Sequence, residues 1–491
     1  MIKGGQLKFL NQDQICEIYL GALDILQNTG VRVREARILK TLKGAGCQTD
    51  GEMAKMPTYL VEEAIRKAPS RFTICGRGPN TMVRMEDRRV YFEPMIGRLN
   101  ILDAQTKSKR RTTLQDVVNL IKIADALPNY HILHSGAVMP HIEGIPDEVS
   151  HVYGYLASAK NSSKVIKGTC RGKNRAIDCI RMASTVAGGE KDLQKKPNIF
   201  TTYNVISPLE HGQEMLEGLI EYVKYGLPVD ITSEPQMGAT SPVTLAGTLT
   251  QQTAEVFSGI VIAQLLSPGT PVFFGTCGAA MDMRYGTIAL GGIEAGLLNA
   301  AHAQIAQFLK IPSRGTGANT QSKVLDFQAG YEKTITLLIP AMAGINMVFY
   351  PGTIEHAETI SLESLVIDHE ICSIISRALR GIGVNENTLA LDLINKVGPG
   401  GHFLKEHHTI DYLQTEHYTP KLADRRKRED WETDGSQDLA RVAEEEVEQL
   451  LLEHRPLPLE QKVEEGLLQI VKEVEKRELK GEKVTTIGRS L

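Results

Sequence analysis

Side chains that could do chemistry stand at the ends of short apolar runs in this chain of 491 residues. They are Lys167, Tyr203, Asn204, Glu234, Gln236, Cys277, Arg314, Asn319, Tyr350, Glu355 and His356. Glu355 and His356 are adjacent in FYPGTIEHAETIS, and a carboxylate beside an imidazole can perform acid–base catalysis or orient a substrate. We therefore predict that this pair is catalytic. A purely structural hydrogen-bond network is the alternative.

Two other residue types suggest different chemistry. Lys167 in VIKG stands where the Schiff-base lysine of an aldolase-type barrel would stand, so a lyase is an alternative function, although such a lysine commonly forms a salt bridge. Cys277 follows PVFFGT with no base nearby in the sequence and is interpreted as a small buried thiol. The histidines between His402 and His417 match no zinc template, and we predict that the chain binds no metal directly.

Short apolar runs alternate with helical patterns from about residue 129 onward. The eight runs cover 131–138, 164–170, 198–207, 228–234, 271–277, 311–317, 344–352 and 400–404. Strands that are apolar throughout and are each followed by a helix indicate a parallel sheet covered on both faces. Eight such units predict an α/β fold, the (β/α)8 TIM barrel, with its active site on the loops after the strands. A doubly wound open sheet is the competing fold, but no GxGxxG opens a helix after the first strand.

The regions on either side of the barrel differ from it in composition. We expect an N-terminal extension of helices and short strands, the catalytic barrel, and a charged C-terminal helical segment at residues 1–128, 129–420 and 421–491. In the last segment Val463, Leu467, Ile470 and Val474 recur at helical spacing. We predict that this stripe docks on the body or contributes to a homo-oligomer. A solvated charged tail is the alternative.

Composition and charge exclude several classes of protein. The 55 basic and 59 acidic side chains give a formal net charge of −4, which argues against binding nucleic acid. Residues 256–281 carry no charge, but Gly259 and Pro271 interrupt them, so we predict a buried helix and strand and no membrane span. Seven irregularly spaced cysteines without a CxxC pair, and no recognisable signal peptide, indicate a cytoplasmic protein with reduced thiols.

Three long motifs resemble the trimethylamine–corrinoid methyltransferase family. They are TGANTQSKVLDFQAGYEK (316–333), AMAGINMVFYPGTIEHAETISLESLVIDHEI (341–371) and VGPGGHFLKEHHTIDYLQTEHYTPKLADRRKREDW (397–431). Founding members carry pyrrolysine, whereas this chain contains only standard residues, so it resembles the branch that demethylates quaternary amines such as glycine betaine. The resemblance implies methyl transfer from nitrogen to the Co(I) of a cobalamin-type corrinoid, carried by a separate corrinoid protein. A non-catalytic scaffold for that corrinoid protein is a further alternative.

A quaternary amine already carries its positive charge and leaves as a neutral tertiary amine, so its demethylation requires no general acid. Aromatic faces can hold such a cation, and an arginine can hold the carboxylate of a betaine. The expected substrate-binding residues are Tyr91, Phe92, Tyr203, Phe274, Arg314, Phe349 and Tyr350, with His356 as another possible clamp. The residues expected to face the corrinoid, where small side chains would admit a flat macrocycle, are Gly315, Gly317, Asn319 and Gln328.

Overall fold

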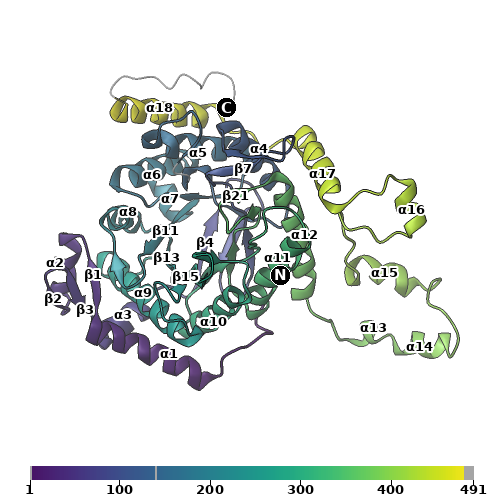
Figure 1. Ribbon diagram of the computed structural model, residues 1–491, viewed down its shortest axis with the longest axis horizontal. Helices are drawn as coiled ribbons and strands as arrows, with labels where there is room; N and C mark the ends of the chain where they lie inside the picture. Colours follow the sequence, from purple (N-terminus) through teal and green to yellow (C-terminus); the bar gives the residue numbers. More distant parts are fainter. Residues whose placement is uncertain (1–2, 139–140, 480–491) are drawn as a thin grey trace.

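Eight parallel strands form a closed barrel in the computed structural model, which describes residues 3–138 and 141–479 (Figure 1). In chain order they are β6 (Tyr91–Glu93), β9 (Ile132–Leu133), β10 (Val165–Gly168), β11 (Ile199–Val205), β13 (Val229–Ser233), β15 (Val272–Thr276), β18 (Ser313–Thr316) and β19 (Met347–Phe349). The strands from β9 to β19 pair in chain order, and β19 pairs with β6. Bridges from Phe92 to Tyr130 and from Met95 to His134 close the ring between β6 and β9. The predicted (β/α)8 TIM barrel is confirmed.

The first strand of the barrel lies earlier in the chain than the sequence pattern indicated. Seven of the eight expected runs contain the strands β9 to β19. The run at 400–404 contains no strand, and all five of its residues are exposed, so that expectation was wrong. β6, within the segment 1–128, occupies the place between β19 and β9 and leaves no gap for another strand. Gly400, with φ of 79°, favours a turn at this point instead of an extended chain.

One long helix follows each strand and covers the outside of the barrel (Figure 1). These helices are α4 (Leu114–Ala126), α5 (Asp147–Asn161), α6 (Lys173–Ala187), α8 (Gln213–Lys224), α9 (Leu245–Leu266), α10 (Ile293–Leu309), α11 (Phe327–Ala343) and α12 (Leu362–Leu379). The uncharged stretch 256–281 forms the end of α9 and all of β15, as predicted. No helix within residues 3–138 or 141–479 has the length and apolar character required to span a membrane.

The barrel interior has two layers of different chemistry, because alternate side chains of each strand point inward. Near the strand starts the layer is apolar, with Ile132, Val165, Phe200, Phe273, Met347 and the partly buried Tyr91. The hairpin of β4 (Phe72–Cys75) and β5 (Met82–Met85) packs on this layer and closes that end of the barrel. Toward the strand ends the next layer is charged and buried, with Glu93, His134, Lys167, Asp230 and Arg314. The interior is therefore reached from the carboxyl ends of the strands.

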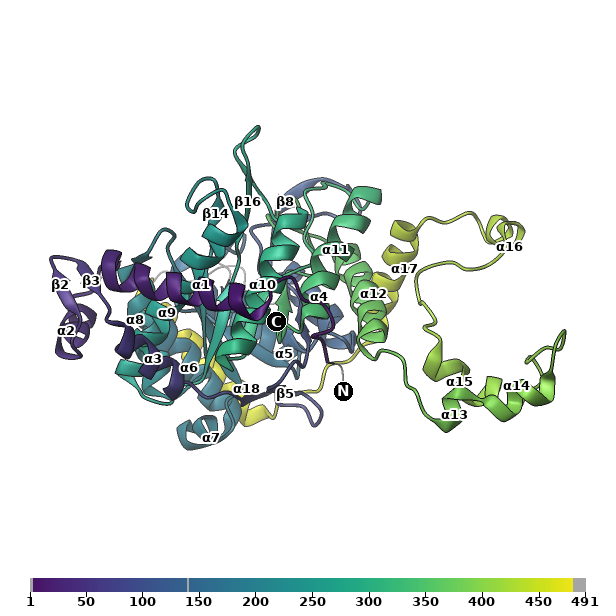
Figure 2. The ribbon, with the colours of Figure 1, turned by 90° about the horizontal axis from the view of Figure 1, so that it is seen from below.

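The N-terminal region before β6 packs against the outside of the barrel. Helices α1 (Gln12–Asp24) and α3 (Thr58–Lys67) lie against α9. Strands β1 (Val31–Val33), β2 (Gln48–Asp50) and β3 (Met53–Lys55) lie at the purple edge of Figure 2, and β12 (Glu210–His211), from the region after β11, completes their sheet by pairing with β1.

The charged C-terminal region is docked on the body, as predicted. Helix α17 (Leu439–Glu453) packs against α4 and α12, and α18 (Gln461–Glu478) packs against α5 and α6. The predicted stripe is covered, with Leu467, Ile470 and Val474 buried and Val463 partly buried. Arg477 of α18 donates two hydrogen bonds, of 3.0 and 2.6 Å, to the buried carboxylate of Asp178. The end of the segment, 480–491, lies outside the described residues.

Deleting residues 456–491 is expected to lower the melting temperature of the protein. The four buried side chains of α18, at Leu467, Ile470, Val471 and Val474, contribute on the order of 6–12 kcal/mol before entropic costs. The deletion would also leave the buried Asp178 without its arginine. Thermal unfolding followed by circular dichroism measures the effect. A truncated protein that melts at the temperature of the full chain would show that α18 does not support the body.

Candidate active site

A cavity of about 380 Å³ opens at the carboxyl ends of the barrel strands, above the charged layer. Its volume is at the lower end of the range for small-molecule sites, about 300–1,000 Å³. The side chains that matter for chemistry come from seven different strand ends and one loop. They are His134, Lys167, Thr202, Asn204, Glu234, Cys277, Arg314, Phe349 and Tyr350 from the strands, and Arg98 from the loop after β6.

Arg314 is the centre of the charged layer beneath this cavity. Its guanidinium donates hydrogen bonds of 2.8 and 3.0 Å to Glu93 and one of 2.8 Å to Asp230, and it lies 3.6 Å from the ring centroid of Phe349. Burial would raise the pKa of Glu93, but Arg314 and then His134 outweigh it, so this pKa is lowered and the carboxylate is ionised. Arg314 is thus already committed to two carboxylates of the protein. A second role as the predicted substrate clamp remains a hypothesis.

Lys167 and His134 complete the floor of the cavity. Lys167 Nζ lies 3.4 Å from His134 Nδ1, which in turn lies 2.9 Å from Glu93 Oε1. Burial, together with the charge of Lys167, lowers the pKa of His134 to about 3, so its ring is neutral at pH 7. Burial, together with the charge of Arg314, lowers the pKa of Lys167 to about 7. The charge of the floor therefore changes near neutral pH.

Phe349 and Tyr350 form an aromatic wall, with ring centroids 4.4 Å apart. Tyr350 has φ of 101°, a rare conformation for a bulky residue. It allows the consecutive residues Phe349 and Tyr350 both to line the cavity. Arg98 Cζ lies 4.9 Å from the Tyr350 centroid, and Arg98 has no ion-pair partner among residues 3–138 and 141–479. This guanidinium lies beside the aromatic wall, and its charge acts on the Glu234 carboxyl of the same cavity without forming an ion pair with it, so it remains able to bind an anionic group of a ligand.

Glu234 and Cys277 lie nearer the mouth of the cavity. Burial raises the pKa of the Glu234 carboxyl, with Arg98 opposing the shift. Burial, followed by the charge of Glu234, raises the pKa of the Cys277 thiol well above its usual value. A protonated thiol is a poor nucleophile. The interpretation of Cys277 as a buried thiol is confirmed.

Four of the predicted aromatic residues do not reach the cavity. Phe92, Tyr203 and Phe274 point outward between the strands and the helices, where Phe274 stacks on His302 with centroids 4.3 Å apart. Tyr91 points inward but belongs to the apolar layer at the closed end. Consecutive residues of a strand face opposite sides. The position of an aromatic residue near a strand end therefore does not show whether its side chain faces the interior, unless the register of the strand is known.

Glu355 and His356, the predicted catalytic pair, lie outside the cavity lining, on the turn between β20 (Thr353–Ile354) and β21 (Thr359–Ile360). The Glu355 carboxylate accepts hydrogen bonds of 2.8 Å from Lys109 and 2.6 Å from Thr359. This arrangement matches the structural hydrogen-bond network that the sequence left as the alternative. A catalytic role for the pair remains a prediction that the geometry does not favour.

The residues expected to face the corrinoid also lie outside the cavity lining. A Cβ atom at Gly315 would lie 2.1 Å from Asn299 Oδ1, and one at Gly317 would lie 2.5 Å from Val348 Cγ1. These glycines therefore allow close packing of side chains around β18, and Asn319 is buried as well. Gln328, at the start of α11, is partly exposed and hydrogen-bonds Glu332. Contact with a corrinoid remains a hypothesis for all four.

Sequence reasoning missed several residues of the cavity and its floor, among them Glu93, Arg98 and Asp230. Glu93 and Arg98 were not predicted as site residues because β6 was assigned to the N-terminal extension instead of the barrel. Asp230 carried a usable signal, since PVDITSE alternates and places Asp230 on the same face as Glu234. A charged residue within an otherwise apolar barrel strand is costly to bury and so indicates a partner or a function.

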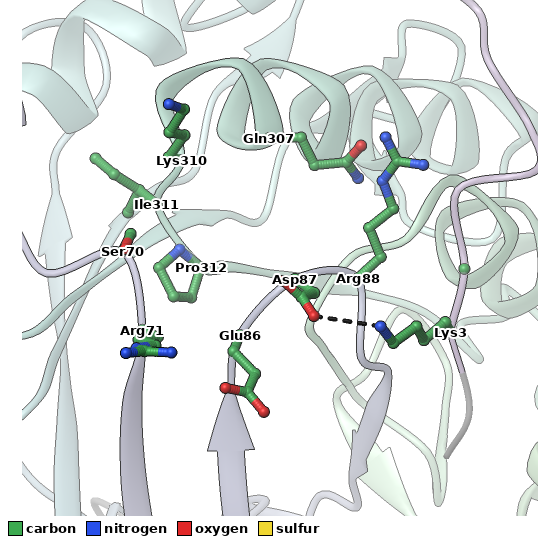
Figure 3. A pocket seen from close by; sticks show the side chains of 11 residues that line it. Lys3, Ser70, Arg71, Glu86, Asp87, Arg88, Gln307, Lys310, Ile311 and Pro312 are labelled. Atoms are coloured by element: carbon green, nitrogen blue, oxygen red, sulfur yellow. Dashed lines mark hydrogen bonds and ion pairs between the residues drawn. The ribbon is translucent and has the colours of Figure 1, made fainter.

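A second cavity, of about 800 Å³, lies at the opposite end of the barrel (Figure 3). It is lined by Lys3, Gly4, Ser70, Arg71, Glu86, Asp87, Arg88, Gln307, Lys310, Ile311 and Pro312. Lys3 and Asp87 form an ion pair of 3.2 Å between exposed side chains. Its larger volume does not make it the active site, because barrel enzymes carry their chemistry at the carboxyl ends of the strands.

No group of three or more His, Cys, Asp or Glu side chains in the described ranges is arranged to hold a metal ion. Residues 2–479 match the family described as trimethylamine methyltransferase (MTTB). The chain belongs to this family. As a member of the trimethylamine methyltransferase family it is a methyltransferase, and the resemblance noted in its motifs is confirmed.

The similar proteins include one named for glycine betaine and others named for trimethylamine. The glycine betaine methyltransferase of Desulfitobacterium hafniense strain Y51 is 36% identical over 86% of this chain and 88% of its own length. The trimethylamine methyltransferase MttB of D. hafniense strain DCB-2 is 34% identical over 96% of this chain and 95% of its own. The crystal structure of the monomethylamine methyltransferase MtmB of Methanosarcina barkeri aligns with 93% of this chain and 96% of that chain, at a TM-score of 0.48 and 12% identity.

Proposed function

We propose that this enzyme transfers a methyl group from a quaternary amine, with glycine betaine as the principal candidate, to the Co(I) of a corrinoid held by a separate protein. The observation that carries the proposal is the pairing, in one cavity, of an aromatic wall with the guanidinium of Arg98. The wall suits a trimethylammonium group, and the guanidinium suits a carboxylate. Glycine betaine presents both groups on one small molecule. The 36% identical glycine betaine methyltransferase supports this choice.

The proposed reaction requires little acid–base catalysis from the protein. The methyl group leaves a positively charged nitrogen, and the remaining amine is neutral, so no proton has to be delivered to it. The chain therefore has to position the substrate, exclude water and present one methyl group at the mouth of the cavity. The protonated Cys277 thiol is a poor nucleophile, and the neutral His134 ring is no strong acid at pH 7, so both fit such a site.

The floor of the cavity favours a cationic substrate when Lys167 is neutral. Glu93 and Asp230 then oppose the single charge of Arg314, and Asp230 Oδ1 has no hydrogen-bond partner among residues 3–138 and 141–479. When Lys167 is protonated, the charges of these four groups sum to zero. One unit of negative charge below a quaternary ammonium group is a favourable interaction in a buried site.

Binding of glycine betaine is therefore expected to strengthen as the pH rises from 6 to 8. Lys167, with its pKa lowered to about 7, loses its proton over this interval and ceases to repel the cation. The effect should be on the order of tenfold, since nearby unit charges interact by about 1–3 kcal/mol in such a medium. Isothermal titration calorimetry without the corrinoid protein measures it. Lys167→Met should remove the pH dependence and His134→Gln should retain it; a pH-independent wild type would contradict the assignment.

A corrinoid, when bound, supplies the nucleophile that accepts the methyl group. A cavity of about 380 Å³ suits a betaine, and a macrocycle carried by another protein would have to lie over its mouth. The four residues expected to face the corrinoid do not line this cavity, so they do not support a position of the corrinoid over its mouth.

We place the enzyme in the cytoplasm, because its seven cysteines are all free thiols.

Conversion of a Co(I) corrinoid protein to its methyl-Co(III) form tests the proposal directly. The enzyme is incubated with the reduced corrinoid protein and, in separate samples, with glycine betaine, proline betaine, carnitine and trimethylamine. We expect the spectral change with glycine betaine. Turnover of trimethylamine with no activity on any betaine would refute the quaternary substrate, and binding of the corrinoid protein without any turnover would support the non-catalytic scaffold.

One observation keeps the lyase alternative testable. Lys167 is buried in the cavity, and its lowered pKa would leave part of it unprotonated at pH 7, as a Schiff-base lysine requires. The alternative predicts that borohydride traps a covalent adduct between Lys167 and a carbonyl substrate. Betaines have no aldehyde or ketone, so they should give no such adduct. Family membership favours methyl transfer.

A further inference from the structure

Glu234 is the one acidic side chain of the cavity and its floor that has no ion-pair partner in the described parts of the chain. The carboxylates of the floor form ion pairs with Arg314, and the carboxylate of Glu214, which also lines the cavity, lies 3.7 Å from Arg171. Glu234 forms no hydrogen bond or ion pair with any residue of 3–138 or 141–479. The contacts thus give Glu234 no structural role, unlike the other carboxylates of the site.

The position of Glu234 makes its carboxyl group accessible to a ligand. Glu234 follows directly after β13, and its side chain is exposed to the cavity, whereas Ser233, the last residue of that strand, is buried. The carboxyl group therefore belongs to the wall of the cavity and not to the buried charged layer below it. A ligand in the cavity can approach this group without first breaking a contact within the protein.

Arg98 provides a charge of opposite sign in the same cavity. Its Nε atom is buried and has no hydrogen-bond partner within the described ranges. Burial raises the pKa of Tyr350, the charge of Arg98 opposes this shift, and the charge of Glu234 adds to it. Arg98 and Glu234 therefore both lie close to Tyr350, although they form no ion pair with each other. The cavity thus presents a positive and a negative group, held apart, beside its aromatic wall.

Two opposite charges that are held apart in one small cavity fit a ligand that carries both signs. Each group has lost part of its hydration without gaining a partner, which is unfavourable until a ligand supplies the opposite charge. A zwitterion supplies it to both groups at once. A carboxylate without a cation would gain the contact with Arg98 but would be repelled by Glu234, so the two residues together also select against such a ligand.

We propose that Glu234 determines the specificity of this site, with its carboxylate facing the quaternary ammonium group of the substrate while Arg98 binds the substrate carboxylate. The inference rests on the proposed function, since that function supplies the quaternary amine. A quaternary nitrogen has no N–H to donate, so Glu234 attracts it by charge alone, across the methyl groups. Removal of this one charge should therefore weaken the selection for the cation and leave the selection for the carboxylate.

Two ligands of nearly the same shape separate the effect of charge from that of fit. Glycine betaine and the anion of tert-butylacetic acid both carry a carboxylate, but a neutral carbon in the second replaces the charged nitrogen. Calorimetry of the full chain at pH 8, without corrinoid protein, measures both affinities. Glu234→Gln should weaken the binding of glycine betaine roughly tenfold, the effect of one nearby charge, and should not weaken that of tert-butylacetate. Glu234→Asp, which keeps the charge, should retain most of the wild-type preference.

Glu358→Gln is the matched control, because it removes the same charge from a side chain that is 65% exposed and lies outside the cavity lining, so it should keep the preference. An unchanged preference in Glu234→Gln, or an equal loss of affinity for both ligands, would overturn the inference and leave the proposed function intact. A wild-type enzyme that binds both ligands equally would overturn it without any variant. Turnover of trimethylamine with no binding of any betaine would instead refute the proposed function, and the inference with it.

Discussion

Replacing Arg314 with methionine should destabilise the protein by on the order of 3–5 kcal/mol, the usual effect of removing one partner from a buried ion pair. The substitution leaves Glu93 and Asp230 buried without their counter-charge. Urea unfolding at pH 8, followed by circular dichroism, measures the loss as a lower midpoint. The difference in midpoint between the variant and the wild type should shrink toward pH 5. Arg314 is the main group that lowers the pKa of Glu93, so this pKa would rise in the variant. Protonation of Glu93 would then relieve the buried charge.

Arg98→Met is the matched control for this experiment. It makes the same substitution in the same cavity, but at an arginine with no ion-pair partner in the described parts of the chain, so its urea midpoint should be close to that of the wild type. Equal midpoints for Arg314→Met and the wild type would show that the floor cluster does not contribute to stability.

The same Arg98→Met substitution should weaken glycine betaine binding by roughly 10- to 150-fold. This range corresponds to the loss of a hydrogen bond between charged groups, about 1.5–3 kcal/mol. Binding of tetramethylammonium, which has the cation without the carboxylate, should change little, because the aromatic wall of Phe349 and Tyr350 is intact. Calorimetry with the two ligands separates these contributions.

Arg98→Lys provides the second comparison, since it keeps the charge but loses the planar pair of donors, and it should fall between the wild type and methionine. An equal loss for both ligands in Arg98→Met would indicate that Arg98 acts by supporting Tyr350. No loss for either would remove Arg98 from the site.

The sequence predicted the architecture well because a barrel repeats one unit. Apolar runs followed by helices recur, and seven of the eight expected runs contain barrel strands. The remaining barrel strand, β6, was not predicted as part of the barrel. It ends in Glu93 and precedes a long loop, so it lacks the apolar character of the other strands. Charge in a strand normally counts against burial, and here it is balanced by Arg314, which lies 221 positions away in the chain.

The site was predicted less well for two physical reasons. Strand ends were identified correctly, but the inward face of each strand depends on register, so Tyr203 and Phe274 were chosen although they face the helices. Arg98 lies on a loop whose path no periodicity describes. Lys167 was assigned correctly to a strand end, but its lowered pKa arises from burial and from the approach of Arg314, which only the folded chain brings about.

The β4–β5 hairpin that plugs one end of the barrel has a consequence for the order of events in turnover. With that end closed, the proposed substrate and product would pass through the carboxyl end of the barrel, over which the proposed corrinoid would also lie. Under the proposed function, the amine would enter before the corrinoid protein covers the mouth, and the demethylated product would depart only after that protein has dissociated. Under this arrangement the two substrates bind in a compulsory sequence, and separation of two proteins sets an upper limit on the rate of each cycle.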